Sequence, residues 1–174
     1  MCLMCDGASI DEVRFRVHGC ITQYGWYIQA VEAGNDGTDW AYTVGLSAGF
    51  DHPELVVVGL DFLEGGALLN ALAQEVGHGD MFVAGEQLRV LGDVAELVEV
   101  NPRQFEHGTF ATWSDYYSCL GPPLPRAHAL QVWLPEVDPL RLDTASNVLG
   151  ASGPNRAERR RRQRRKPSGR RYRR

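Results

Sequence analysis

The chain has 174 residues, of which 44% are hydrophobic and 23% are charged, a composition typical of a soluble globular protein. This length suits one domain with its own core, and no run approaches the roughly 18–20 apolar residues that a membrane-spanning helix needs. The N-terminus lacks the basic start and apolar segment of a signal peptide. We therefore expect a cytoplasmic protein with reduced cysteines and no membrane partner.

The net charge of −4 hides a sharp division of charge along the chain. Residues 156–174 carry twelve arginines and lysines against one glutamate, which gives +11, whereas the other 155 residues carry six basic and 21 acidic residues, which gives −15. The basic segment has no apolar face to bury and cannot offset the entropy of ordering itself. The sequence therefore predicts an acidic domain over residues 1–149 and a disordered, Arg-rich tail over residues 150–174.

Turn residues and apolar periodicity divide the acidic domain into helices and strands. Ser9 and Glu12 form a capping box before the first helix, and Gly92-Asp93 suits a two-residue hairpin turn. Three consecutive valines, Val56–Val58, have apolar side chains on both faces and indicate a strand at the centre of a sheet. The predicted helices cover residues 10–24, 62–76 and 112–120, and the predicted strands cover residues 26–32, 40–46, 55–60, 88–91, 94–100 and 129–134.

The order of these elements predicts the fold class. The strands come in hairpins and the helices in separate blocks, which favours an α+β domain over a doubly wound fold. We expect a single domain with two main helices and a curved, mainly antiparallel sheet of about six strands, which could close into a barrel. Gly65-Gly66, in the first turn of the second helix, indicates either a late helix start or close backbone packing.

Several motifs carry a resemblance to a known family. The chain opens with Met1-Cys2-x-x-Cys5-Asp6, Gly25-Trp26 follows the first helix, and the later matches are Ala41-Tyr42-Thr43-Val44-Gly45-Leu46, His52-Pro53-Glu54-Leu55, Gly59-Leu60, Leu68-Leu69-Asn70 and Leu130-Gln131-Val132-Trp133. Over residues 1–135 the chain resembles the bacterial domain-of-unknown-function family numbered 4262, which is common in actinobacteria. The resemblance implies a small cytosolic bacterial domain and no established activity. The chain departs from the family after Trp133, where members tend to have Trp-Pro-Asp and Phe-Pro-Trp segments.

His52 is the candidate catalytic residue, because it lies between Asp51 and Pro53 with Glu54 close by. A histidine next to a carboxylate can act as an acid or base since its pKa lies near neutrality. His52 with Asp51 or Glu54 would then serve an enzyme of unassigned reaction. The alternative is that His-Pro-Glu only forms a turn. Whether the protein is a binding module or an enzyme, we expect His52→Ala to leave the fold intact. We expect no phosphate loop, dinucleotide fingerprint or serine nucleophile elbow.

The cysteines suggest a metal site. Cys2 and Cys5 have the C-x₂-C spacing that lets two thiolates hold one zinc ion, and His18 and Cys20 are the nearest residues that could complete it. The alternative is an N-terminus with free, reduced thiols. Cys119 is a conceivable nucleophile, but no histidine can be paired with it from the sequence, and we expect it to be buried.

Aromatic residues could line an apolar pocket for a planar ligand such as a flavin. The candidates for ligand binding are Trp40, Tyr42, His52 and Trp133. The alternative is that they belong to the core. The leading hypothesis is a binding module for an unidentified small molecule or protein.

The tail predicts a second kind of partner, because clustered arginines bind phosphate backbones and release counterions. A nucleic acid or another polyanion is therefore an expected partner, and the alternative is a tail that only keeps the protein soluble. The residues expected to make these contacts are Arg159, Arg160, Arg161, Arg162, Arg164, Arg165 and Lys166.

Overall fold

The computed structural model describes residues 9–33, 38–138, 140–144 and 149. The strands are β1 (Tyr27–Val31), β2 (Trp40–Val44), β3 (Glu54–Val58), β4 (Gln87–Val90), β5 (Asp93–Glu99) and β6 (Ala129–Trp133). The helices are α1 (Ile10–Tyr24), α2 (Leu46–Gly49), α3 (Phe62–His78), α4 (Arg103–Glu106) and α5 (Ala111–Leu120).

The six strands form one sheet in the order β1-β2-β3-β6-β5-β4. Neighbouring strands are antiparallel except for β3 and β6, which are parallel. The predicted α+β fold with a mainly antiparallel sheet of six strands is therefore confirmed. The sheet has β1 and β4 at its edges and does not close into a barrel.

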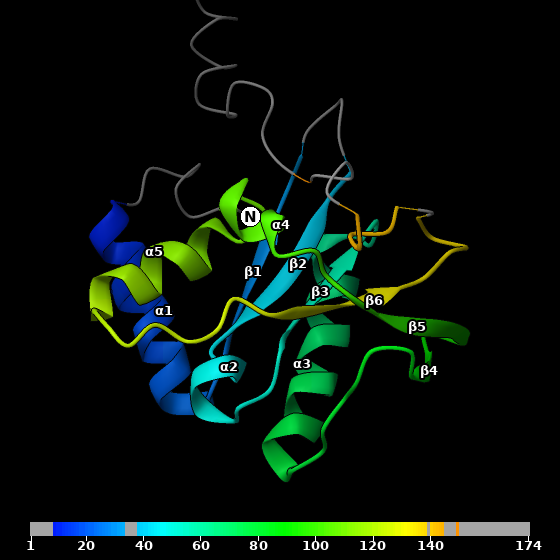
Figure 1. Cartoon of the computed structure of the whole chain (residues 1–174), viewed down its shortest axis with the longest axis horizontal. Coiled ribbons are helices and arrows are strands. Elements are labelled where there is room, and N and C mark those ends of the chain that lie inside the picture. Colours follow the sequence, from blue (N-terminus) through cyan, green and yellow to red (C-terminus); the bar gives the residue numbers. More distant parts are fainter. Residues whose placement is uncertain (1–8, 34–37, 139, 145–148, 150–174) are drawn as a thin grey trace, which may run out of the picture.

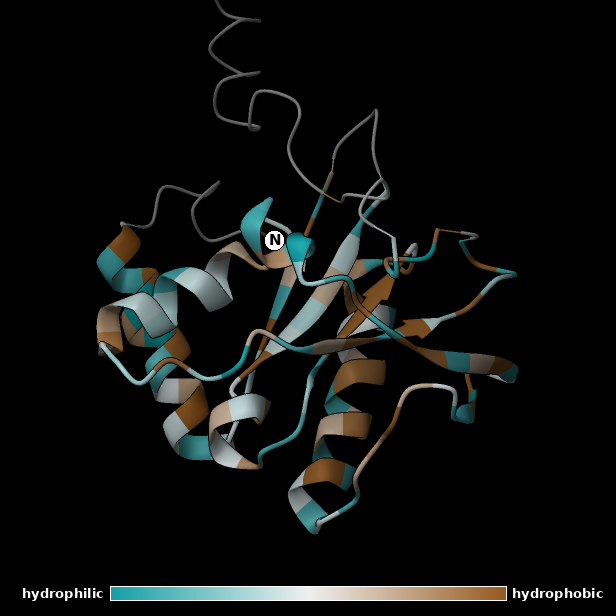
Figure 2. Ribbon diagram, in the orientation of Figure 1, coloured by the Kyte–Doolittle hydropathy of each residue, from teal (hydrophilic) through white to brown (hydrophobic). Residues whose placement is uncertain are grey.

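Helices cover both faces of the sheet, with α3 on one side and α1 and α5 on the other (Figure 1). Successive side chains of a strand point to opposite faces, so Ala41 and Val57 pack toward α3 while Tyr42 and Val56 pack toward α1 and α5. Every residue of β2 and β3 is buried, which confirms the prediction of a central strand at Val56–Val58. In Figure 2 the hydrophobic residues gather on α3 and on the central strands.

The first helix has the predicted bounds because both of its ends carry local signals. The side chains and backbones of Ser9 and Glu12 cap each other at the start, and Gly25 takes the left-handed conformation at the end, with φ of 91°. Arg14 then joins α1 to α5 through two hydrogen bonds to the carboxylate of Asp115, of 2.9 and 2.7 Å. None of the helices in the described ranges is long and apolar enough to cross a membrane.

Three local predictions differ from the structure. The connection between the two central strands contains the short helix α2, which was not predicted. The hairpin between β4 and β5 turns on Leu91 and Gly92, one residue earlier than predicted, and both residues have positive φ. Helix α3 runs past Gly77 and ends at Gly79, whose φ of 106° suits a C-cap.

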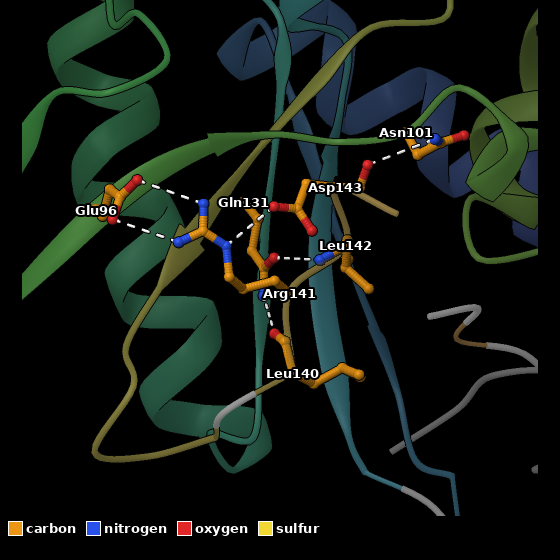
Figure 3. Close-up of polar contacts among 7 residues, drawn as sticks. All are labelled: Glu96, Asn101, Gln131, Leu140, Arg141, Leu142 and Asp143. Atoms are coloured by element: carbon orange, nitrogen blue, oxygen red, sulfur yellow. Dashed lines mark hydrogen bonds and ion pairs between the residues drawn. The ribbon is translucent and has the colours of Figure 1, made fainter. Parts of the chain in front are cut away.

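Residues 140–144 pack against the sheet and are called here the C-terminal strap (Figure 3). The buried amide of Gln131 donates to the carbonyl of Leu140 over 2.7 Å and accepts from the N–H of Leu142 over 2.8 Å. Arg141 lies between the carboxylates of Glu96 and Asp143. The fold therefore continues past the last strand, whereas the predicted tail over residues 150–174 lies outside the described residues.

Candidate functional site

A pocket of about 500 Å³ opens at the end of the sheet where β3 and β6 begin. Its walls come from the segment between β2 and β3, from residues 81–84 after α3, and from the chain around the start of β6. The parallel pairing of β3 with β6 brings the first and the last of these segments together, although more than 70 residues separate them in the sequence. The volume falls in the range of roughly 300–1,000 Å³ that is usual for small-molecule sites.

The floor of the pocket is apolar. Phe82 and Leu130 are both almost fully buried, and the ring of Phe82 meets that of His52 edge to face, with centroids 5.7 Å apart. Met81 and Val83 stand at its mouth with 56% and 58% of their surface exposed. A ligand in this pocket would therefore meet apolar surface both inside and at the entrance.

His52 has only 1% of its surface exposed, and both of its ring nitrogens are engaged. Nε2 accepts a hydrogen bond from the N–H of Phe82 over 3.1 Å, so the proton lies on Nδ1, which donates to the carbonyl of Pro53 over 2.6 Å. Burial lowers the pKa of His52 and favours this neutral form. Neither nitrogen is hydrogen-bonded to Asp51 or Glu54. Because both nitrogens hold backbone groups, we expect His52→Ala to destabilise the fold, contrary to the expectation from the sequence.

Glu54 is fully buried and holds the turn between β2 and α2 in place. Its carboxylate accepts five hydrogen bonds, from the hydroxyls of Thr43 and Ser47 and from the backbone N–H groups of Gly45, Leu46 and Ser47. Burial raises the pKa of Glu54, although these hydrogen bonds oppose the shift. Its oxygens are thus occupied by the fold itself.

Gly45, Ser47 and Gly49 have the G-x-S-x-G spacing of a serine nucleophile elbow, which sequence reasoning overlooked, and Ser47 and Gly49 lie within α2, directly after β2. The geometry nevertheless differs from that of a nucleophile elbow. The strained turn of an elbow is made by the serine itself, whereas here Gly45 has the positive φ, of 125°. The Ser47 hydroxyl donates to Glu54 over 2.7 Å.

Besides His52, four charged or ionisable side chains line the pocket, namely Asp51, Glu99, Arg126 and His128. His128 Nε2 lies 3.7 Å from a carboxylate oxygen of Glu99. Asp51 and Arg126 are exposed, and within the described part of the chain their side chains make no hydrogen bond or ion pair. Sequence reasoning missed Glu99, Arg126 and His128, because no local pattern marks residues that only the tertiary fold brings to one pocket.

The predicted aromatic ligand residues do not lie around one site. Trp40 and Tyr42 are buried against α5, where the Trp40 indole donates to the Thr109 carbonyl over 3.1 Å and the Tyr42 hydroxyl accepts from the backbone N–H of Thr112 over 2.9 Å. Trp133 lies at the opposite end of β6 from the pocket, under the guanidinium of Arg141. Of the four predicted residues only His52 lines the pocket.

Only half of the predicted zinc ligands can be placed. Cys2 and Cys5 lie outside the described residues, while His18 Nδ1 is 3.1 Å from the Tyr116 hydroxyl and Cys20 is half-buried. The described ranges contain no cluster of three or more His, Cys, Asp or Glu side chains arranged to hold a metal ion. Cys119 is exposed, so the expectation that it is buried is wrong; it lies near the end of α5, on the solvent side.

A family model described as a domain of unknown function, DUF4262, matches residues 20–138. The chain belongs to this family. The matched region of the DUF4262 domain includes all six strands and every residue that lines the pocket, whereas the C-terminal strap lies beyond it. No curated protein and no solved structure matches the chain.

Proposed function

We propose that this domain is a binding module that holds a small molecule in the pocket at the start of β3 and β6. The observation that carries the proposal is the pairing of an apolar floor with two charged side chains, Asp51 and Arg126, that have no partner within the described part of the chain. Ligand sites commonly combine apolar walls with a few polar groups that fix orientation. The proposal keeps the binding function expected from the sequence and moves it from the predicted aromatic residues to this pocket.

The rival function, an enzyme that uses His52 as acid or base, fits this geometry less well. His52 would first have to release the carbonyl of Pro53 or the N–H of Phe82 before it could exchange a proton with a substrate. Asp51 and Glu54 make no hydrogen bond to its ring. Binding alone requires no such rearrangement.

The test is a small-molecule screen on the full-length, ¹⁵N-labelled chain, read by amide chemical-shift changes. Ligands of the pocket should shift amides of residues 81–84 and around the start of β6. Val83→Lys places a charge at the apolar mouth and should weaken binding, while the control Val94→Lys changes an exposed valine of β5 away from the pocket. If the two variants weaken binding equally, or if no compound shifts these amides, the proposal is wrong.

A second function, contact with nucleic acid or another polyanion, is favoured by the charge of the chain end. The last 19 residues carry +11, and the last described residue before them, Leu149, is anchored by the side chains of Gln104 and Thr109. The segment that carries these charges is therefore attached to the domain beside α4, where Leu149 is held.

The experiment for this second function is a salt titration of RNA and DNA binding by the full chain. Binding through the tail should weaken steeply as salt rises, because counterions are released. Replacement of Arg159–Arg162 by glutamine should reduce the slope of affinity against salt by about 3 to 4. An unchanged slope would show that these arginines do not contact the polyanion.

A further inference from the structure

The pocket carries a pattern of groups that points to the chemical class of its ligand, and this inference rests on the binding function proposed above. Groups of both signs line the same small space, with Asp51 and Glu99 as acids and Arg126 as a permanent cation. Glu99 already has His128 3.7 Å away, whereas Asp51 and Arg126 have no partner in the described ranges. One free anion and one free cation at one pocket suit a ligand that itself carries both charges.

Ser47 adds a directional preference to this pattern. Its hydroxyl proton is used in the 2.7 Å hydrogen bond to the buried carboxylate of Glu54. A hydroxyl that has donated its only proton can only accept further hydrogen bonds. Any contact that the Ser47 hydroxyl makes with a ligand in the pocket is therefore as an acceptor, which suits an ammonium group and not a carboxylate.

The floor is matched to the remaining, uncharged part of such a ligand. Both nitrogens of His52 are occupied by backbone groups, so its ring presents no free donor or acceptor to the pocket. Together with Phe82 and Leu130 it forms a surface that an apolar side chain can cover without leaving a polar group unsatisfied. The pocket thus combines a hydrogen-bond acceptor (Ser47), an anion (Asp51), a cation (Arg126) and an apolar floor.

We propose that the pocket binds a free amino acid with an apolar side chain. Asp51 and the Ser47 hydroxyl receive its ammonium group, the Arg126 guanidinium pairs with its carboxylate, and its side chain lies on His52, Phe82 and Leu130. The planar guanidinium of arginine can hold a carboxylate by two parallel hydrogen bonds, which makes it the natural anchor for that end.

The experiment measures affinity by calorimetry and amide chemical shifts on the full chain, using L-leucine, L-methionine and L-phenylalanine. Two analogues of phenylalanine separate the charges: 2-phenylethylamine lacks the carboxylate and 3-phenylpropionate lacks the ammonium group. Each analogue should bind about tenfold more weakly than L-phenylalanine, as expected for the loss of one charge-assisted contact.

The variants should resolve the two ends of the ligand. Arg126→Gln should weaken binding of L-phenylalanine and 3-phenylpropionate but leave binding of 2-phenylethylamine unaffected. Asp51→Asn should weaken binding of L-phenylalanine and 2-phenylethylamine but leave binding of 3-phenylpropionate unaffected. Arg103→Gln and Asp93→Asn change exposed charges on α4 and on the β4–β5 hairpin and serve as matched controls that should have no effect.

The failures of the two proposals differ in outcome. If other compounds shift the pocket amides while amino acids do not, the amino-acid assignment is wrong and the binding function stands. Equal affinity for L-phenylalanine and both analogues would also overturn the assignment alone. If amino acids shift only amides elsewhere, the amino-acid assignment is wrong, and if no compound of any class shifts the pocket amides, both proposals fail.

Discussion

Glu54 and His52 lie two residues apart, and the fold uses both of them to fix the wall of the pocket. Glu54 accepts five hydrogen bonds from residues 43–47, at the end of β2 and the start of α2. His52 joins the α2–β3 connection to the segment after α3. Each is a buried polar side chain whose hydrogen bonds are satisfied, as burial of polar groups requires. Replacement of either side chain should therefore lower the stability of the fold.

Replacement of Glu54 by alanine should lower the free energy of unfolding by roughly 3 kcal/mol or more, because several buried donors lose their acceptor together. The control is Glu75→Ala on the exposed face of α3, which should change stability by less than about 0.5 kcal/mol. Urea denaturation of both variants measures the difference. Similar stability of the two would show that the donors around Glu54 find other partners.

The lowered pKa of His52 predicts a pH dependence of stability. Below the ordinary histidine pKa of about 6.5 the unfolded chain takes up a proton that folded His52 resists, so its contribution is present above that pH and is lost as the pH falls through the folded pKa. The wild type should therefore lose stability between pH 6.5 and 5 more steeply than His52→Gln.

Urea denaturation at several pH values measures this slope for both proteins. His107→Gln removes an exposed histidine and should keep the wild-type slope. If His52→Gln also keeps it, the pKa of His52 is not lowered by folding, and the predicted loss of stability at low pH does not come from this residue.

Among the helices and strands, those with capping or turn residues at their own ends were predicted best. The bounds of α1 follow from Ser9, Glu12 and Gly25, and the strands around Val56 follow from composition. The β4–β5 turn was placed one residue late because glycine is the usual turn residue, whereas here Leu91 also adopts a positive φ, of 55°. Helix α2 was missed because four residues are too few to show a helical period.

The candidate site could be predicted only in part. His52 was found because its chemistry is evident from the sequence, but its bonds to Pro53 and Phe82 depend on the packing of the loop after α3. Arg126 comes from a loop that approaches the pocket through the pairing of β3 with β6. Such nonlocal pairing leaves no periodic trace in a single sequence.

The two glycines at the start of α3 should respond differently to substitution, because only one of them touches the sheet. A Cβ on Gly65 would lie 3.4 Å from Val57 and 3.6 Å from Ala41, whereas a Cβ on Gly66 would meet nothing within 4 Å. Gly66→Ala should stabilise the fold by about 0.5–1 kcal/mol through helix propensity. Gly65→Leu should destabilise it by about 1–3 kcal/mol through overpacking.

Thermal denaturation of Gly65→Leu beside Gly66→Leu gives the matched comparison. The same side chain should be harmful at the first position and tolerated at the second. Equal melting temperatures would mean that α3 can move away from the sheet without cost. This result would also show that the stability of the fold does not depend on close packing of Gly65 against the sheet.

For the whole molecule, the C-terminal strap extends the domain beyond the region that the family model matches. Leu142 and Leu149 are both buried in the same core cluster as Trp40 and Tyr42, although the match ends at residue 138. A chain that ends at Asp138 would expose this part of the core and leave the amide of Gln131 without its partners.

Truncation after Asp138 should therefore lower the melting temperature by roughly 10 °C or more, since two buried leucines and a buried amide lose their contacts. Truncation after Gly153 keeps the strap and should leave the melting temperature unchanged. Differential scanning calorimetry of both chains beside the full chain measures this. If both truncations behave alike, the strap contributes nothing to stability.

The position of β6 has a consequence for how the protein is made. The three strands β1, β2 and β3 can pair as they leave the ribosome, and so can the hairpin of β4 and β5, but β6 alone joins the two groups and is synthesised last. Until Ala129–Trp133 emerges, the valine-rich edge of β3 has no neighbour and can pair with another nascent chain. We therefore expect the nascent chain to be most prone to aggregation while the segment between β3 and β6 is translated.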